Sequence, residues 1–225
     1  MKYAKILEGT FLMRPNRFIA YVNIKGKEEI CHVKNTGRCK ELLLAGVKVY
    51  LEESSNPLRK TKYDLVAVKK GSLLINMDSQ APNKVALEWL RGGTIPGITY
   101  IKPESTYGNS RFDFYFEQGK KKSYLEVKGV TLEDNGIVKF PDAPTERGIK
   151  HINELISLSK KGYGAYLLFV VQMPKARHFE PNYATHLAFG QALKRAKKAK
   201  VKILAYTRTV TKNSLKIKEE IPIKL

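Results

Sequence analysis

Cysteine, long apolar runs and acidic residues are all scarce in this sequence. The chain of 225 residues has two cysteines, Cys31 and Cys39, which are too few for a disulfide framework. His32 adds a further zinc ligand beside them, but a structural zinc site needs more ligands at tighter spacing, so we expect no zinc. No apolar run approaches the roughly 20 residues of a membrane-spanning helix. The first residues lack the apolar segment of a secretory signal peptide. We therefore expect a cytoplasmic protein with no membrane partner.

The shortage of acidic residues leaves a large positive charge. Lys and Arg number 41 against 21 Asp and Glu, which gives a formal net charge of +20 at pH 7. Such an excess favours association with polyanions, so nucleic acid comes first among the expected partners. A hydrophobic content of 43% and 12 tyrosines indicate a folded globule rather than a disordered tail.

Short alternating stretches separated by turn signals fill residues 1–80. Strands are expected over residues 4–13, 18–24, 29–33, 47–51, 63–69 and 72–76, with a short helical turn near 40–44. Many short strands at close spacing predict an OB-like β-barrel domain over residues 1–80. Periodicity alone does not separate an OB fold from other small barrels.

The hydrophobic period changes near Pro82, and residues 81–225 follow an α/β order. Helices are expected over 83–91, 145–161 and 182–200, and strands over 99–105, 111–117, 122–128, 166–171 and 201–206. The stretch 166–171 is a nearly continuous apolar run, which is typical of a strand buried on both faces. The order predicts an α/β domain with a mixed sheet flanked by helices.

Two neighbouring strands carry charged residues that suit metal-dependent cleavage of phosphodiesters. Asp113 lies in the first, and Glu126 and Lys128 lie in the second, where residues two apart share a face. Two carboxylates can hold Mg²⁺ or Mn²⁺, and a nearby ammonium can orient water or stabilise developing charge. The same pattern also suits an amphipathic hairpin whose polar side chains face water.

Further polar residues are candidates for the same site. Glu104, on the preceding strand, is either an outer carboxylate for the metal or a salt-bridge residue at the strand end. Arg147 and His151 are four apart on the helix 145–161, so they share a face that could hold a scissile phosphate or simply meet solvent. Asp142 or Thr145 is expected to cap this helix.

Basic residues beside aromatic ones punctuate the expected barrel and are candidates for nucleic-acid binding. They are Arg14, Arg17, Arg38, Arg59 and Lys60. Barrels of this kind can use basic grooves and exposed aromatic rings to contact phosphates and bases. Most of the aromatic side chains would equally suit the core. Nothing in the pattern specifies a base sequence.

The chain resembles the sugar fermentation stimulation protein A (SfsA) family. The matching segments occur in order at 17–20, 35–37, 108–114 (GNSRFDF), 125–132 (LEVKGVTL), 140–151 (FPDAPTERGIKH) and 168–172. The resemblance implies an OB-like domain, a PD-(D/E)XK nuclease-like domain, nonspecific DNA binding and a role in regulating sugar metabolism. The sequence departs from the family at Pro144, which is sterically harmless before a helix start, and in a Lys-rich C-terminal tail.

The order of elements around the charged residues is the order that the nuclease fold requires. In that frame Asp113 and Glu126 are expected to bind the metal together with the backbone carbonyl of Val127. Lys128 is expected near the attacking water. The main hypothesis is a DNA-binding protein with a divalent-metal nuclease site. The alternative is a non-catalytic DNA-binding regulator of sugar metabolism, because a fold does not imply a function.

Overall fold

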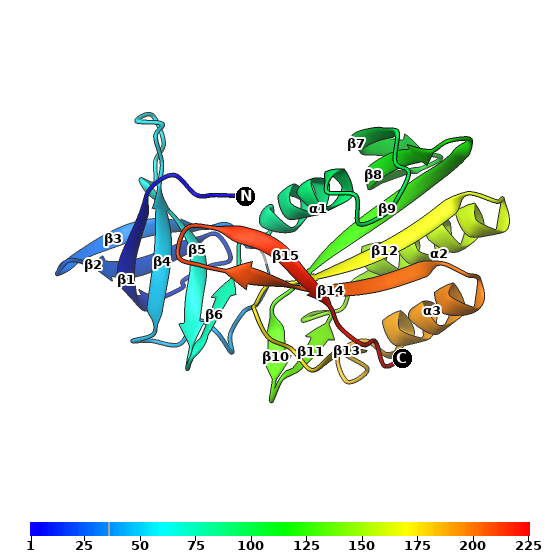
Figure 1. Cartoon of the computed structure of the whole chain (residues 1–225). Coiled ribbons are helices and arrows are strands. Elements are labelled where there is room, and N and C mark those ends of the chain that lie inside the picture. Colours follow the sequence, from blue (N-terminus) through cyan, green and yellow to red (C-terminus); the bar gives the residue numbers. More distant parts are fainter. Residues whose placement is uncertain (36) are drawn as a thin grey trace.

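The computed structural model describes residues 1–35 and 37–225. Thr36, which belongs to the resembling segment 35–37, lies outside the described residues. The chain begins with β1 (Ile6–Met13), β2 (Ile19–Ile24), β3 (Lys27–Val33), β4 (Lys48–Glu53), β5 (Tyr63–Lys70) and β6 (Leu73–Asn76). These strands form one sheet in the order β3-β2-β1-β4-β5-β6, and a parallel pairing of β3 with β5 closes it into a barrel (Figure 1).

The interior of the barrel follows from alternation along its strands. In β2, Ala20, Val22 and Ile24 are buried while the residues between them are only half-buried. Strands with one face on a core show this period of two. Gly9 in β1 lies against this interior, and a Cβ there would stand 2.6 Å from Cγ1 of Val22. A side chain at position 9 would therefore push Val22 out of place.

An α/β domain follows the barrel. Its elements are α1 (Ala81–Arg91), β7 (Tyr100–Tyr107), β8 (Ser110–Gln118), β9 (Lys121–Val130), β10 (Leu132–Asp134), β11 (Ile137–Phe140), α2 (Glu146–Lys160), β12 (Gly164–Val171), β13 (His178–Pro181), α3 (Leu187–Lys198), β14 (Lys202–Val210) and β15 (Leu215–Glu220). The larger sheet has the order β15-β14-β12-β9-β8-β7, and β10, β11 and β13 form a smaller one. The central strand β12 runs parallel to both β9 and β14, whereas the outer pairs are antiparallel.

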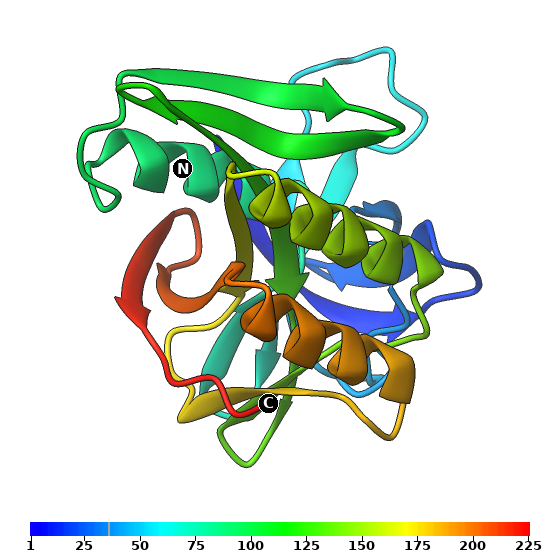
Figure 2. The same ribbon diagram turned by 90° about the vertical axis from the view of Figure 1, so that its right-hand side faces the viewer.

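Helices cover both faces of the larger sheet. Leu167 and Phe169 of β12 belong to the apolar cluster that contains the inner faces of α2 and α3. Tyr166 and Leu168 belong to a second cluster with α1. Figure 2 shows α2 and α3 side by side over the strands. Because β12 is buried on both faces, its sequence is continuously apolar.

The helix α2 begins where a side chain satisfies a free backbone amide. Oγ1 of Thr145 accepts a hydrogen bond from the amide of Gly148 at 3.0 Å. This is the N-cap geometry, in which a short polar side chain stands in for the missing carbonyl partner. Asp142, the other candidate cap, instead accepts from the backbone amide of Arg38 at 3.2 Å. That bond links the approach to α2 with the barrel.

A buried polar network also joins the barrel to the α/β domain. Arg208 of β14 is fully buried and donates from Nη2 to Oδ1 of Asn76 at 2.9 Å and to Oε1 of Gln172. Asn76 ends β6, and its amide donates to the hydroxyl of Tyr3 at 2.8 Å. Burial lowers the pKa of Arg208 to about 9. Loss of one member would leave a buried polar group without its partner, so the network resists separation of the two parts.

The expected architecture, a small OB-like barrel followed by a mixed sheet flanked by helices, is confirmed. Several details differ. The helix expected from residue 182 begins at Leu187, because residues 182–185 form a turn in which Oδ1 of Asn182 accepts from the amide of Thr185. The helical turn expected near 40–44 is an irregular turn. The expected Lys-rich tail contains β15, which pairs with β14. In the part of the chain that the structure describes, no helix is long and apolar enough to cross a membrane.

Candidate metal centre

Asp113 is held at its place in β8 by two neutral donors from other elements. Oδ2 accepts from the backbone amide of Val127 in β9, and Oδ1 accepts from Nδ2 of Asn83 in α1, both at 2.7 Å. Burial and the nearby charge of Glu126 raise the pKa of Asp113 above its usual range. The two hydrogen bonds therefore fix the orientation of the carboxylate, but their neutral donors do not balance its negative charge.

Glu126 projects from β9 toward α2 and is 3% exposed. Its Oε1 accepts from Nζ of Lys128 at 2.5 Å and contacts Nδ1 of His151 in α2. Burial alone would raise the pKa of Glu126, but the hydrogen bond with His151 and the charge of Lys128 overcome it and lower the pKa. Glu126 is consequently an ionised carboxylate at neutral pH.

The two oxygens of Glu126 are used unequally. Oε1 has both partners, whereas the buried Oε2 has no hydrogen-bond partner among the described residues. A buried ionised oxygen without a partner is unfavourable unless something else binds it. With the carboxylate of Asp113 and the carbonyl of Val127 close by in sequence and structure, the donor set consists of hard oxygen ligands. Mg²⁺ and Mn²⁺ prefer such ligands, so these residues fit the expected ion.

Glu104 lies apart from this pair. Its side chain is 70% exposed, and its carboxylate stands 3.8 Å from Nη1 of Arg111. The backbone of Glu104 has a positive φ of 52°, which interrupts the regular pairing of β7 with β8 opposite Asp113. Across residues 1–35 and 37–225, no three His, Cys, Asp or Glu side chains come together as a metal-binding group. The metal roles of Asp113, Glu126 and Val127 stay predictions that the geometry accommodates, with Glu104 placed as a surface residue.

The two helix residues expected to bind phosphate take different positions. His151 is buried and contacts the carboxylate of Glu126, and its role in binding phosphate stays a prediction. Arg147 lies one turn earlier on α2 and is exposed. The i, i+4 spacing was a sound guide to a shared face, but the packing of α2 against β9 buries only the second member.

The basic residues of the barrel also divide into two groups. Arg14 donates to four backbone carbonyls, including Asn35 and Gly37, and Arg59 binds Asp64 through both terminal nitrogens. These two guanidinium groups thus hold loops and strands of the barrel together. The exposed members are Arg17, Arg38 and Lys60. Their role in nucleic-acid binding stays a prediction.

Asn83 is the contact that the sequence pattern missed. It lies on α1, thirty residues before Asp113, and its position in a helix gave no sign of a hydrogen bond to a strand. Gln172, at the exit of β12, is committed to Arg208 and to the domain junction. In the sequence, the one sign of a role for Gln172 was its position as a polar residue at the end of an apolar strand.

These observations define a class of protein: an OB barrel joined to an α/β domain with a mixed sheet between helices, and two carboxylates where that sheet meets its helices. Residues 12–77 match the model of the SfsA N-terminal OB domain, and residues 80–214 match that of the Sugar fermentation stimulation protein RE domain. The chain therefore belongs to the sugar fermentation stimulation protein family.

Full-length relatives support the same assignment. The Sugar fermentation stimulation protein homolog of Clostridium beijerinckii is 57% identical over 224 residues, covering 99% of each chain. That of Desulfitobacterium hafniense is 57% identical over 225 residues, covering 100% of this chain and 99% of the relative. The structure of Pyrococcus furiosus SfsA in complex with Ca²⁺ matches with a TM-score of 0.88 and 28% identity, covering 100% of this chain and 98% of that one.

Proposed function

We propose that this chain binds DNA largely without regard to sequence and hydrolyses phosphodiesters at a divalent-metal centre built on Asp113 and Glu126. The observation that carries the proposal is Oε2 of Glu126, a buried oxygen of an ionised carboxylate that lacks a hydrogen-bond partner among the described residues. A second carboxylate with a raised pKa lies close to it. Strongly perturbed acids in this arrangement are typical of functional sites. The net charge of +20 supports a polyanionic substrate.

The residues that would hold the ion are Asp113, Glu126 and the carbonyl of Val127. When bound, Mg²⁺ or Mn²⁺ supplies an activated water and stabilises charge on the phosphate. The P. furiosus relative in complex with Ca²⁺ supports a centre for hard cations, because Ca²⁺ also takes oxygen ligands. Asp113 would need no rearrangement to bind the ion, since hydrogen bonds from Val127 and Asn83 already fix the orientation of its carboxylate.

Lys128 and His151 have separate tasks in this proposal. The ammonium of Lys128 is bonded to Glu126, and its side chain is still 18% exposed. It can therefore orient a water that enters from solvent, because an ammonium has three donors and Glu126 takes one. His151 is buried and acts through Glu126, which makes it a positioning residue. It fixes the carboxylate so that Oε2 faces away from the helix-side contacts.

A non-catalytic DNA-binding regulator is the second candidate function. The observation that favours it is Oε1 of Glu126, which already has both Lys128 and His151 as partners. A carboxylate paired with an ammonium in this way can persist in a fold that no longer cleaves its ligand. The two candidates share DNA binding and differ only in hydrolysis.

Incubation of the full chain with labelled DNA and RNA, single- and double-stranded, separates the two candidates. With Mg²⁺ or Mn²⁺ we expect cleavage that chelator abolishes and that Glu126→Gln reduces by at least about a hundredfold. The matched control is Glu133→Gln, because Glu133 is a buried carboxylate of the same domain with both oxygens bonded, to Gly136 and to Lys70. Cleavage that survives in Glu126→Gln would overturn the assignment of the centre. Binding without any cleavage would favour the regulator.

A further inference from the structure

A basic cavity of about 610 Å³ lies between the end of β1 with its following loop, the segment 37–45, and Ala143 of the α/β domain. Among the described residues that line it, four are basic, namely Arg14, Arg17, Arg38 and Lys40, and none is acidic. Its remaining walls include the apolar side chains of Phe11 and Leu43. A cavity with apolar walls and a basic rim fits a ligand that is both aromatic and anionic, as a nucleotide is.

A second cavity of about 300 Å³ lies between the barrel and the α/β domain. Asn35 and Ser79 line it from one side, and Lys139 and Thr145 line it from the other. Gly129 also lines it and directly follows Lys128 in β9. Thr145 begins α2, the helix that carries His151. Gly129 and Thr145 thus place this cavity beside β9, which carries Glu126, and beside α2, which carries His151.

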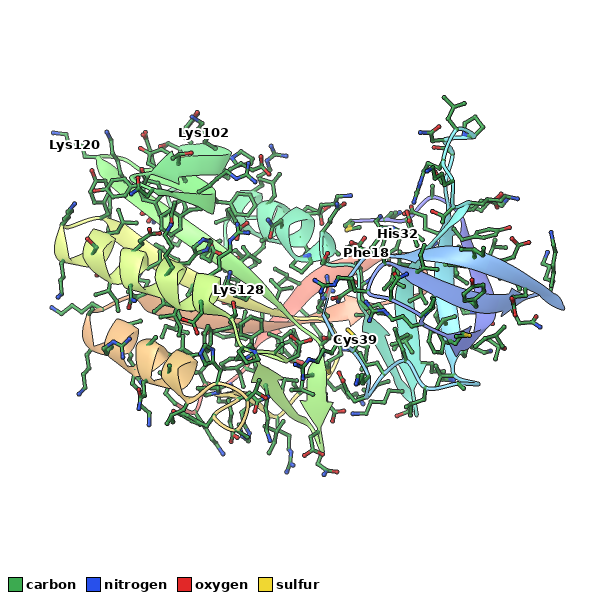
Figure 3. All side chains as sticks on the ribbon, turned by 180° about the vertical axis from the view of Figure 1, so that it is seen from behind. Phe18, His32, Cys39, Lys102, Lys120 and Lys128 are labelled. Carbon is green, nitrogen blue, oxygen red and sulfur yellow. The ribbon has the colours of Figure 1, made fainter. Side chains whose placement is uncertain are left out.

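Gly37 and Ala143 line both cavities, so the cavities meet at these two residues. The basic cavity and the junction cavity are therefore adjacent, and we call the two cavities together the path. Figure 3 shows Phe18 and Cys39 at the end of the barrel nearest the α/β domain, with Lys128 in that domain. Asp142 is the acidic group on the path, and its carboxylate already accepts from the backbone amide of Arg38.

An exposed aromatic ring lies next to Arg17, a residue of the basic cavity. Phe18 is 51% exposed, which is unusual for a phenylalanine, and the guanidinium of Arg17 lies 6.0 Å from its ring centroid. Arg17 also lines the basic cavity. An aromatic ring beside a basic groove provides a stacking surface for bases, and paired bases inside a duplex do not offer their faces to it.

From this path we infer that the substrate is single-stranded nucleic acid, which stacks a base on Phe18 and passes its backbone through the neck at Gly37 and Ala143 to Glu126. Arrival of the strand at Glu126 rests on the proposed function, whereas binding of the strand to the barrel does not. The positive charge of the basic cavity supports a nucleic acid as its occupant, because the described lining contains arginine and lysine side chains and no carboxylate. The proposed occupant is an unpaired strand, and the experiment compares its binding with that of a duplex.

Binding is measured without metal, so that hydrolysis does not enter. Fluorescence anisotropy in chelator compares a labelled single strand of mixed sequence with the blunt duplex formed from it. The single strand should bind more tightly, and Phe18→Ala should weaken its binding by about fivefold to 150-fold, the range that corresponds to loss of one stacked base. The matched control is Tyr100→Ala, because Tyr100 is an aromatic residue of β7 with a similar exposure of 50%. It should bind as the wild type does.

Charge provides an independent measurement. Replacement of Arg17 and Arg38 by alanine should reduce the slope of log affinity against log salt by about 1.4, the value for two lost phosphate contacts on a single strand. The matched control, Arg91→Ala with Arg195→Ala, removes two exposed arginines from the ends of α1 and α3. A smaller change is expected there, since neither residue borders the path.

The outcomes are separable from those of the proposed function. If the duplex binds as tightly as the single strand and Phe18→Ala matches Tyr100→Ala, the path is overturned, even where Glu126 is required for cleavage. If the single strand is preferred and Phe18→Ala weakens it, the single-strand site on the barrel stands, even where no substrate is cut. A further variant, Ser79→Trp, fills the junction cavity and leaves the lining of the basic cavity intact, so it should reduce cleavage of a single strand while leaving its binding to the barrel in place. Wild-type cleavage in that variant would overturn the route through the junction cavity to Glu126.

Discussion

Two buried carboxylates, one in the barrel and one in the α/β domain, hold the same charge in different ways. Asp64 in β5 is 5% exposed and receives Arg59 at 2.8 and 2.6 Å and Nδ1 of His32 at 2.9 Å. Both of its oxygens are bonded. Glu126 is equally buried, but its partners Lys128 and His151 gather on one oxygen. Asp64 is a complete ion pair, whereas Glu126 keeps one position free for a ligand.

The difference shows that burial and charge do not by themselves mark a functional acid. Arg59 fits Asp64 as a fork, which satisfies the carboxylate and fixes the hairpin between β4 and β5. At Glu126 the partners Lys128 and His151 leave Oε2 without a hydrogen-bond partner among the described residues. The number of partners on each oxygen is therefore a better guide to function than the total number of ion pairs. Four changes would break or sharpen this comparison.

Removal of the complete pair should have the largest effect. Asp64→Ala is expected to lower the free energy of unfolding by about 3 kcal/mol, because Arg59 and His32 lose their buried partner. Urea denaturation followed by circular dichroism measures the change. Glu28→Ala, which removes an exposed acid of the same barrel, should change it by less than about 0.5 kcal/mol. Equal losses in both variants would show that Asp64 is not held as an ion pair.

If Oε2 of Glu126 binds a metal ion, the ion should stabilise the folded protein. At about a hundredfold excess over its dissociation constant, Mn²⁺ should add about 2.7 kcal/mol to the free energy of unfolding of the wild type. Asp64→Asn should keep this increment, although its baseline is lower, and Glu126→Gln should lose it. Thermal unfolding with and without Mn²⁺ gives the answer. An increment that persists in Glu126→Gln would place the metal elsewhere.

Asp113 and Asp64 should respond to neutralisation with opposite signs. Without metal, Asp113→Asn is expected to gain about 0.5–2 kcal/mol of stability, because burial and Glu126 make its ionised form unfavourable. Its pKa is raised in the folded state, so this gain is full above that pKa and disappears as the pH falls below the usual aspartate value near 3.9. Rotation of the Asn83 amide can supply the acceptor that the new amide needs.

The pKa of Asp64 is lowered, because the hydrogen bonds from Arg59 and His32 outweigh the opposing effect of burial. Its contribution to stability is therefore present above the usual aspartate pKa and is lost as the pH falls through the lowered one. Urea denaturation of both variants between neutral and acidic pH compares the two signs. Loss of stability in Asp113→Asn at neutral pH would contradict the prediction.

The smallest effect is expected for Glu104. Glu104→Ala removes an exposed carboxylate that is 3.8 Å from Arg111, so the free energy of unfolding should change by no more than about 0.5 kcal/mol. The increment from Mn²⁺ should match that of the wild type. A lost increment would make Glu104 a third carboxylate of the centre, as the strand order had allowed.

Much of the architecture was visible in the sequence, because alternation and apolar runs record which faces are buried. The run in β12 and the stripe of α2 are examples, since each residue there packs against a helix or a sheet. The strands β10, β11, β13 and β15 were missed. They are short or rich in charge, and their pairing depends on partners far along the chain, such as His178 beside Ile137. The pattern of apolar and polar residues within one short segment does not indicate a partner that is distant in the sequence.

The site was predictable in its residue types and less so in its contacts. Asp113, Glu126 and Lys128 stood out because charged residues alternated with apolar ones in two neighbouring strands. Whether an arginine faces solvent or an internal acid depends on the folded chain, and Arg59 with Asp64 illustrates this across a hairpin. Likewise the spacing of Arg147 and His151 predicted a shared face toward the acidic residues or solvent, but it did not predict that His151 alone is buried against Glu126.

The network around Arg208 has a mechanical consequence. Rotation of the barrel against the α/β domain would take Asn76 away from Arg208 and leave the buried guanidinium with Gln172 as the remaining partner of Nη2 among the described residues. Such a break is costly, so the joint is expected to be stiff rather than hinged. A polymer that enters between the two parts would meet an aperture of fixed width and would have to adapt its own shape. Selectivity would then come from what fits the opening, with no closing movement of the protein.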